Sequence, residues 1–223
     1  MFNYKEEPHL DKEYKKILTK LKKIYKTNDY DETSFTAYQI AKNIINQKIS
    51  GNIVECGVFK GAKISIFLET LNLLGEKRDI YIVDTFEGMT KPSNDDYQVI
   101  NKRKLKEGDT KASQEYVKKN IYKTNYPREK LHFIKIDVRK EQDLRKCIKG
   151  KIALLRVDTD FYDSVYSILN SLYSKVNKNG YLIHDDYGHW KGHYKACKDF
   201  YKKNNIKPIL IRTSRKERVE IKQ

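Results

Sequence analysis

The stretch IVECGVFKG at residues 53–61 is an apolar run that leads into two glycines, Gly57 and Gly61, with three residues between them. A short apolar run of this kind is typical of a buried strand, and the residues after Gly61 predict a helix that extends to Leu74. The loop differs from the dinucleotide-binding pattern G-x-G-x-x-G, because Phe59 stands where that pattern needs a glycine beside the pyrophosphate. We therefore expect it to bind a nucleoside ligand without a diphosphate.

Four further apolar runs follow, namely IYIVD (80–84), LHFIKID (131–137), KIALLRVD (151–158) and GYLIHDD (180–186). Apolar residues at helical spacing predict helices at 11–26, 33–47, 111–122, 140–149, 163–176 and 192–204. This alternation predicts an α/β fold with a doubly wound, mostly parallel sheet covered on both faces. Residues 207–212 and 217–221 predict an antiparallel C-terminal hairpin. Because no repeat or linker interrupts the pattern, we expect a single domain over 1–223, with residues 1–50 as an N-terminal helical cap.

The composition excludes several classes of protein. The chain has 223 residues and only three cysteines, an odd number at scattered positions, which excludes a secreted disulfide framework and a zinc module. The N-terminus has no apolar core for a signal peptide, and no run approaches the 18 apolar residues of a membrane span. We therefore expect a soluble, cytoplasmic protein without an integral membrane segment.

The formal net charge of +16 is unevenly distributed. Segments 101–150 (16 basic, 7 acidic residues) and 191–223 (11 basic, 3 acidic) are strongly positive, whereas 51–100 (5 basic, 8 acidic) is negative. One interpretation is a cationic rim that attracts an anionic ligand. The other is a set of solvated lysine-rich helices, because lysine outnumbers arginine 37 to 9, as a codon bias would produce.

Carboxylates stand at the ends of the predicted strands. They are Asp84, Asp137, Asp158 with Asp160, and Asp185 with Asp186, while Glu55 lies inside the first strand. Ligands of open α/β sheets bind beyond the carboxyl ends of the strands, so we expect these groups to share one site, with a cation to balance their repulsion. Asp84 is placed to accept hydrogen bonds from ribose hydroxyls, and an acidic loop suits a sulfonium cation such as S-adenosylmethionine.

Four blocks resemble the macrocin O-methyltransferase family: VECGVFKGAKI, DTFEGMTKPSNDD, LRVDTDFYDSV and HDDYGHWKGHYKACKDF. The resemblance covers roughly residues 33–204 in the correct order. It implies a Rossmann-like class I fold and S-adenosylmethionine-dependent methylation of a sugar hydroxyl, in many members with a metal. It also implies a lid or acceptor insert at 97–130.

The resemblance implies roles for individual residues. Glu55, Gly57 and Gly61 would form the loop beside the methionine part of the cofactor, Asp84 would hold the ribose, and Asp137 would lie near the adenine. Thr85 and Phe86 would shape the cofactor pocket. Asp158, Asp185 and Asp186 would bind a metal. Hard carboxylate oxygens select magnesium, calcium or manganese over zinc or copper, and we expect Mg²⁺ or another divalent cation.

The base that accepts the proton of the acceptor hydroxyl has two candidates. His189 is the first, because a histidine pKa suits general-base work, and Asp160 is the alternative beside the catalytic Asp158. We expect the His184 side chain to be packed in the core, because the residue lies within a predicted strand. His193 or Lys195 would instead contact the acceptor.

We expect a sugar or sugar-containing acceptor, small and anionic or nucleotide-linked, from surface-glycan or natural-product biosynthesis. The competing hypothesis, a nucleic-acid-binding methyltransferase, rests on the net charge. Against it, arginine is scarce, no RNA-recognition signature appears and the site is acidic, so we expect no nucleic-acid partner. The sequence leaves open whether the chain forms a homo-oligomer.

Overall fold

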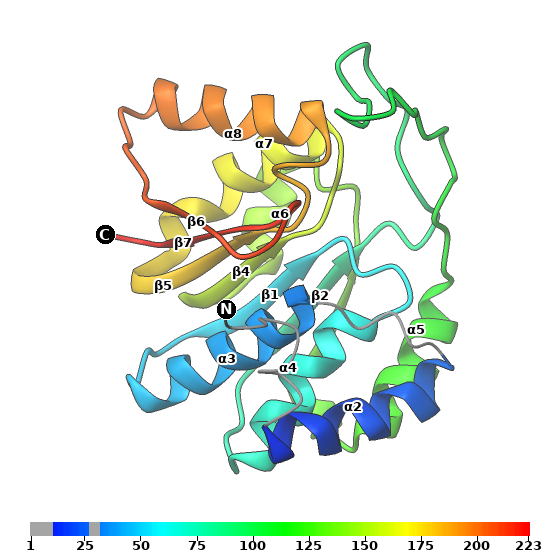
Figure 1. The fold of residues 1–223 in the computed structure, drawn as a ribbon, viewed down its shortest axis with the longest axis vertical. Coiled ribbons are helices and arrows are strands. Elements are labelled where there is room, and N and C mark those ends of the chain that lie inside the picture. Colours follow the sequence, from blue (N-terminus) through cyan, green and yellow to red (C-terminus); the bar gives the residue numbers. More distant parts are fainter. Residues whose placement is uncertain (1–10, 27–31) are drawn as a thin grey trace, which may run out of the picture.

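The computed structural model describes residues 11–26 and 32–223, in which helices cover both faces of a central sheet (Figure 1). The described strands form one seven-stranded sheet of order β3-β2-β1-β4-β5-β7-β6. Strands β1 to β5 are parallel, and β7 runs antiparallel to both β5 and β6. The strands are β1 Asn52–Cys56, β2 Ile80–Asp84, β3 Leu131–Lys135, β4 Ile152–Val157, β5 Val176–His184, β6 Leu210–Arg212 and β7 Arg218–Ile221. The predicted doubly wound sheet with its antiparallel C-terminal hairpin is confirmed.

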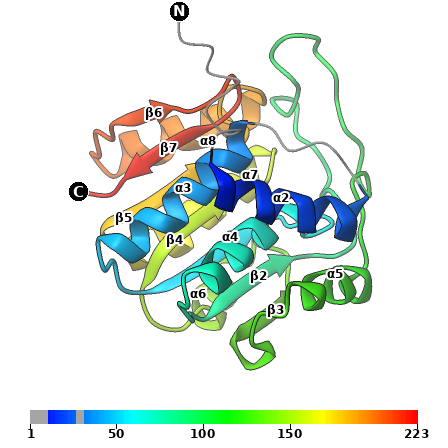
Figure 2. The same cartoon turned by 60° about the horizontal axis from the view of Figure 1, so that its bottom comes forward.

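The helices divide between the two faces of the sheet (Figure 2). One face carries α2 (Lys12–Tyr25), α3 (Glu32–Asn46), α4 (Ala62–Leu73) and α5 (Gln114–Ile121), and the other carries α6 (Glu141–Cys147), α7 (Tyr162–Leu172) and α8 (Lys191–Lys203). Successive strand residues point to opposite faces, so Ile53 packs in the first core and Val54 in the second. Both residues are fully buried, which explains why the strands read as continuous apolar runs.

The N-terminal helices pack on α4. Helix α2 buries Tyr14, Ile17 and Leu21, which lie three and four residues apart on one face. Its N-terminus is capped by Asp11, whose carboxylate accepts a hydrogen bond from the Tyr14 amide at 2.9 Å. The predicted helical cap over 1–50 is described here through α2 and α3, and residues 1–10 and 27–31 lie outside the described part of the chain.

Several element boundaries differ from the sequence prediction, most of all around α7, β5 and α5. Helix α7 ends at Leu172, and a short 3₁₀ turn then leads into β5, which begins at Val176 because it pairs with Ile152 across an irregularity in the register. Helix α5 begins only at Gln114, because the Ser113 hydroxyl caps it.

The connection from β2 to α5 is long and spans residues 85–113. It contains no helix or strand of the sheet, and one isolated bridge joins Gln98 to Trp190, just before α8. The predicted lid or acceptor insert at 97–130 overlaps the second half of this connection. Among the described helices, none has the length and apolar character needed to cross a membrane.

Candidate active site

A cavity of about 740 Å³ opens at the carboxyl ends of the parallel strands, where β1 lies between β2 and β4. Ligands of doubly wound sheets bind at this point, because the chain leaves neighbouring strands in opposite directions there. The cavity brings together eight of the residues predicted from the sequence: Gly57, Asp84, Thr85, Asp137, Asp158, Asp160, Asp185 and Asp186. Four of the seven predicted cofactor residues and all three predicted metal residues therefore share one space.

The loop after β1 is held in shape by Asp84. One carboxylate oxygen of Asp84 accepts hydrogen bonds from the backbone amides of Val58 (2.8 Å) and Phe59 (3.2 Å). Gly57 has φ +84°, and a Cβ on it would lie 2.1 Å from the carbonyl oxygen of Asp158. The loop therefore passes against β4 so closely that only glycine fits. Gly61 stands at the N-cap of α4.

The turn after β2 also depends on Asp84. Its other carboxylate oxygen accepts a hydrogen bond from the Phe86 amide at 2.8 Å. The ring of Phe86 is buried in the core and does not line the cavity, so the structure does not place it against a cofactor as predicted. Thr85 does line the cavity. At Gly88 a Cβ would lie 2.5 Å from the Gly108 carbonyl oxygen, so this turn packs tightly against the last part of the connection before α5.

Asp137 lies at the end of the neighbouring strand. Arg139 forms a two-pronged ion pair with it, and the shorter contact, from Nη2 to Oδ2, is 2.6 Å. The hydrogen bonds from Arg139 hold the pKa of Asp137 below its usual range. Asp137 is therefore an ionised acceptor at the cavity wall.

Three carboxylates meet at the ends of β4 and β5. Each of Asp158, Asp185 and Asp186 offers an oxygen, and these oxygens lie within 4.8 Å of one another. Asp160 adds a fourth carboxyl group, in hydrogen-bond contact with Asp186. Burial, together with repulsion between these neighbours, raises the pKa values of Asp158 and Asp160 well above their usual range.

Arg156 lies beneath this acidic edge and was not predicted as a site residue. Its guanidinium is 1% exposed and forms ion pairs with Glu55, with Asp158 at 2.5 Å and with Asp185 at 2.6 Å. Lys216 adds a second cation, 3.1 Å from the other oxygen of Asp185. The sequence signal for Arg156 was present, because it is the single charged residue inside the apolar run of β4. These are the balancing cations that the predicted repulsion required.

The prediction for Glu55 needs correction. Its carboxylate does not line the cavity but points to the Arg156 guanidinium, and its side chain is only 1% exposed. Burial raises the pKa of Glu55 to about 7, although Arg156 acts in the opposite direction. Glu55 therefore positions Arg156 and does not face the cofactor space.

The histidines also lie differently from the prediction. His189 does not line the cavity, and its ring packs edge-on against Trp190. His184 is fully buried, as expected, but His193 is fully buried too, so it does not face an acceptor. Lys195 lies 3.2 Å from Asp95, which also pairs with Lys191, and so joins α8 to the connection 85–113. Of the two predicted bases, only Asp160 faces the cavity.

The acidic edge fits a hard divalent cation. Its donor atoms are carboxylate oxygens, which magnesium, calcium and manganese prefer. The carboxyl groups of Glu55, Asp158, Asp160, Asp185 and Asp186 also outnumber the cations beside them, Arg156, Lys216 and Lys63. The buried excess of carboxyl groups is what a bound cation would offset.

The strand order, the glycine loop after β1 and the acidic groups after β2 and β4 define a class I methyltransferase fold. The solved structure of the O-methyltransferase NovP has this fold, with a TM-score of 0.77 and 25% identity over 86% of this chain and 80% of that one. A calicheamicin methyltransferase shares the fold at a TM-score of 0.68 and 16% identity, covering 95% of this chain and 93% of that one. The profile of the macrocin O-methyltransferase family, TylF, matches residues 36–215, and the chain belongs to this family.

Two relatives show how far the similarity extends. The chain is 28% identical to demethyldecarbamoylnovobiocin O-methyltransferase of Streptomyces niveus, over 67% of this chain and 57% of the relative. It is 26% identical to a tetracenomycin 4'-O-methyltransferase of Streptomyces olivaceus that acts on a dimethoxyrhamnosyl compound, over 71% of this chain and 59% of the relative. The matches thus span less than two thirds of the length of these relatives.

Proposed function

We propose that this protein is an S-adenosylmethionine-dependent O-methyltransferase that methylates a hydroxyl of a sugar or sugar-containing acceptor in glycan or natural-product biosynthesis. The observation that carries the proposal is that the glycine loop and Asp84 line the same cavity as the carboxylates of Asp158, Asp160 and Asp186. When bound, S-adenosylmethionine supplies a methyl group on a sulfonium centre. Membership of the macrocin O-methyltransferase family supports the choice of an oxygen nucleophile.

The cofactor side of the cavity would be formed by the loop from Gly57 to Gly61, by Asp84 and Thr85, and by Asp137. Asp84 would have two roles. Its carboxylate accepts hydrogen bonds that fix the backbone of the loop and of the turn, and the residue also lines the cavity. Asp137 brings a negative charge to the wall beyond it. These residues bind and orient the cofactor, and orientation of the two reactants is the main source of catalysis in such a transfer.

The acceptor side would be formed by the acidic edge. Asp158, Asp185 and Asp186 would hold Mg²⁺ or another divalent cation, which when bound lowers the pKa of a coordinated hydroxyl. Asp160 lines the cavity beside Asp158 and Asp186, and in its ionised form it would accept the proton of the acceptor hydroxyl. Arg156 and Glu55 position these carboxylates from beneath.

Chelation provides the test of this function. We expect S-adenosylhomocysteine to bind in isothermal titration both before and after treatment with EDTA. Methyl transfer to a panel of nucleoside-diphosphate sugars, followed by mass spectrometry, should stop in EDTA and return with Mg²⁺. The Asp185→Asn variant should lower turnover by about 10–100-fold with little change in affinity for S-adenosylhomocysteine. Absence of S-adenosylhomocysteine binding would overturn the whole proposal, whereas full activity in EDTA would remove only the metal.

We further infer that the acceptor is anionic. Besides Arg156, the cavity wall includes four basic side chains, Lys26, Lys60, Lys63 and Lys216. Lys191 and Lys195 stand nearby on α8, where they surround the single carboxylate of Asp95. These basic side chains would attract a phosphate or carboxylate group on the acceptor.

A comparison of charged and neutral acceptors tests this inference. At low salt we expect a lower KM for a nucleoside-diphosphate sugar than for the free sugar, and this difference should shrink as salt rises, since the screening length falls to about 8 Å. Lys191→Gln should raise the KM for the charged acceptor more than Lys12→Gln on α2. Glutamine is preferable to glutamate here, because a glutamate would also repel Asp95. Equal KM values for both acceptors at low salt would contradict the inference.

A further inference from the structure

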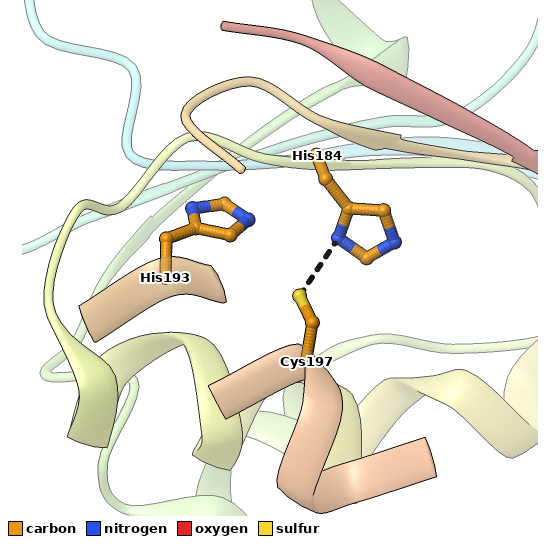
Figure 3. A group of neighbouring side chains, drawn as sticks. All are labelled: His184, His193 and Cys197. Atoms are coloured by element: carbon orange, nitrogen blue, oxygen red, sulfur yellow. Dashed lines mark hydrogen bonds between the residues drawn. The ribbon is translucent and has the colours of Figure 1, made fainter. Parts of the chain in front are cut away.

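Three buried side chains lie together behind the acidic edge, on the side of the sheet that α8 covers (Figure 3). His184 is the last residue of β5, and His193 and Cys197 are one turn apart on α8. All three are fully buried. One potential ligand atom from each lies within 4.8 Å of the other two, and the Cys197 sulfur is 3.5 Å from Nδ1 of His184.

One ring nitrogen of His193 is hydrogen-bonded to the backbone, and the other points toward His184 and Cys197. Its Nδ1 lies 3.0 Å from the backbone carbonyl oxygen of Thr159, which can only accept, so Nδ1 carries the proton. A neutral imidazole that is protonated on Nδ1 keeps a lone pair on Nε2. That Nε2 is buried without a hydrogen-bond partner among the described residues. Figure 3 shows it on the side of the ring that faces His184.

His184 is oriented in the same manner. Its Nε2 lies 2.9 Å from the hydroxyl of Tyr201, and that hydroxyl donates its proton to Glu220. His184 therefore donates from Nε2, and its Nδ1 faces Cys197. A metal ion would displace a proton from the group on binding.

We propose that His184, His193 and Cys197 bind a zinc ion. Two imidazole nitrogens and a thiolate are a zinc donor set, and Zn–N and Zn–S bonds of about 2.1 and 2.3 Å place neighbouring ligands of a tetrahedral ion about 3.5 Å apart. The separation of the Cys197 sulfur and the His184 Nδ1 matches this value. Metal-binding histidines almost always donate their second nitrogen to a carbonyl, a carboxylate or a hydrogen-bonded relay, as both histidines do here.

This site differs from the acidic edge in ligand and in role. Its nitrogen and sulfur atoms select zinc, whereas the carboxylates select a harder cation. His184 directly precedes Asp185 in the chain. His193 is hydrogen-bonded to the backbone carbonyl of Thr159, which lies between Asp158 and Asp160. A zinc ion here would tie β5, α8 and the loop after β4 together beneath the carboxylates. The number and spacing of the cysteines exclude a cysteine-based zinc module. They do not exclude a zinc site with two histidines and one cysteine.

Cobalt substitution tests the proposal through the sulfur ligand. Protein without an affinity tag, purified with EDTA and then kept in excess Mg²⁺ to fill the carboxylates, is titrated with Co²⁺. We expect one equivalent to give a thiolate-to-cobalt charge-transfer band together with the strong visible bands of tetrahedral cobalt, and Zn²⁺ to abolish both. The acidic edge contains no sulfur and cannot produce the first band.

Variants assign the bands to this group. Cys197→Ser should lose the charge-transfer band and bind Zn²⁺ about 100-fold more weakly or worse, whereas Cys147→Ser, at a half-buried cysteine outside the group, should behave as the wild type. Mass spectrometry under native conditions should show one zinc per wild-type chain. Wild-type protein that gives no charge-transfer band, or a Cys197→Ser variant that keeps it, would overturn the proposal. The titration of the wild type tests the proposal even if a variant does not fold.

Discussion

Replacing Arg156 with methionine is expected to lower the free energy of unfolding by about 3–5 kcal/mol, the range found when one partner of a buried ion pair is removed. The guanidinium is 1% exposed and faces the carboxylates of Glu55, Asp158 and Asp185. Methionine fills similar space without charge, so the variant keeps the packing but leaves these carboxylates without their common partner. Each must then be protonated or remain a buried charge, and both cost free energy.

Urea denaturation of the wild type and the variant at neutral pH measures this loss. Arg139→Met is the matched control, because Arg139 pairs with Asp137 at the same sheet edge but its side chain is 39% exposed. Exposed pairs contribute about 1 kcal/mol or less, so the control should remain close to the wild type. Adding Glu55→Gln to Arg156→Met should recover part of the loss, because one buried carboxylate is removed. Equal stability of Arg156→Met and Arg139→Met would show that the carboxylates do not depend on Arg156.

The sequence predicted which carboxylates would meet at the candidate site, and the reason is geometric. Parallel strands end at one edge of a sheet, so Asp84, Asp137, Asp158 and Asp185 had to meet once the five strands were recognised. Arg156 was not identified as a site residue. The alternation of residues along a strand does not show which carboxylates on neighbouring strands a buried guanidinium contacts. Glu55 was misplaced for the same reason, since its partner lies on the neighbouring strand β4 and is 101 residues away in the chain.

The position of His189 was less predictable, because it depends on a turn. His189 is three residues beyond Asp186, which made it the first candidate. The amides of His189 and Trp190 both donate to the Asp186 carbonyl at 3.0 Å, and the His189 carbonyl accepts from Val99 at 2.9 Å. This turn directs the His189 ring against Trp190 and away from the cavity. Such backbone contacts between distant segments leave no local pattern in the sequence.

The largest loss of cofactor affinity is expected from Gly57→Ala. The added Cβ would lie 2.1 Å from the Asp158 carbonyl oxygen and 2.8 Å from its carbon, so either the loop or the end of β4 must move. Both carry residues of the proposed site, the cofactor loop on one side and the acidic edge on the other. A displacement of about 1 Å at a reacting site costs about 100-fold, and we expect S-adenosylhomocysteine to bind at least that much more weakly.

Gly75→Ala separates this steric effect from backbone strain. Gly75 also has positive φ, +68° against +84° at Gly57, but a Cβ there meets nothing within 4 Å. Both variants therefore carry the left-handed backbone cost of about 1–2 kcal/mol, while only Gly57→Ala adds a collision with β4. Calorimetric titration should show S-adenosylhomocysteine affinity at the wild-type value in Gly75→Ala and lost in Gly57→Ala, with thermal melting confirming that both are folded. Affinity in folded Gly57→Ala within threefold of that in Gly75→Ala would place the cofactor away from this loop.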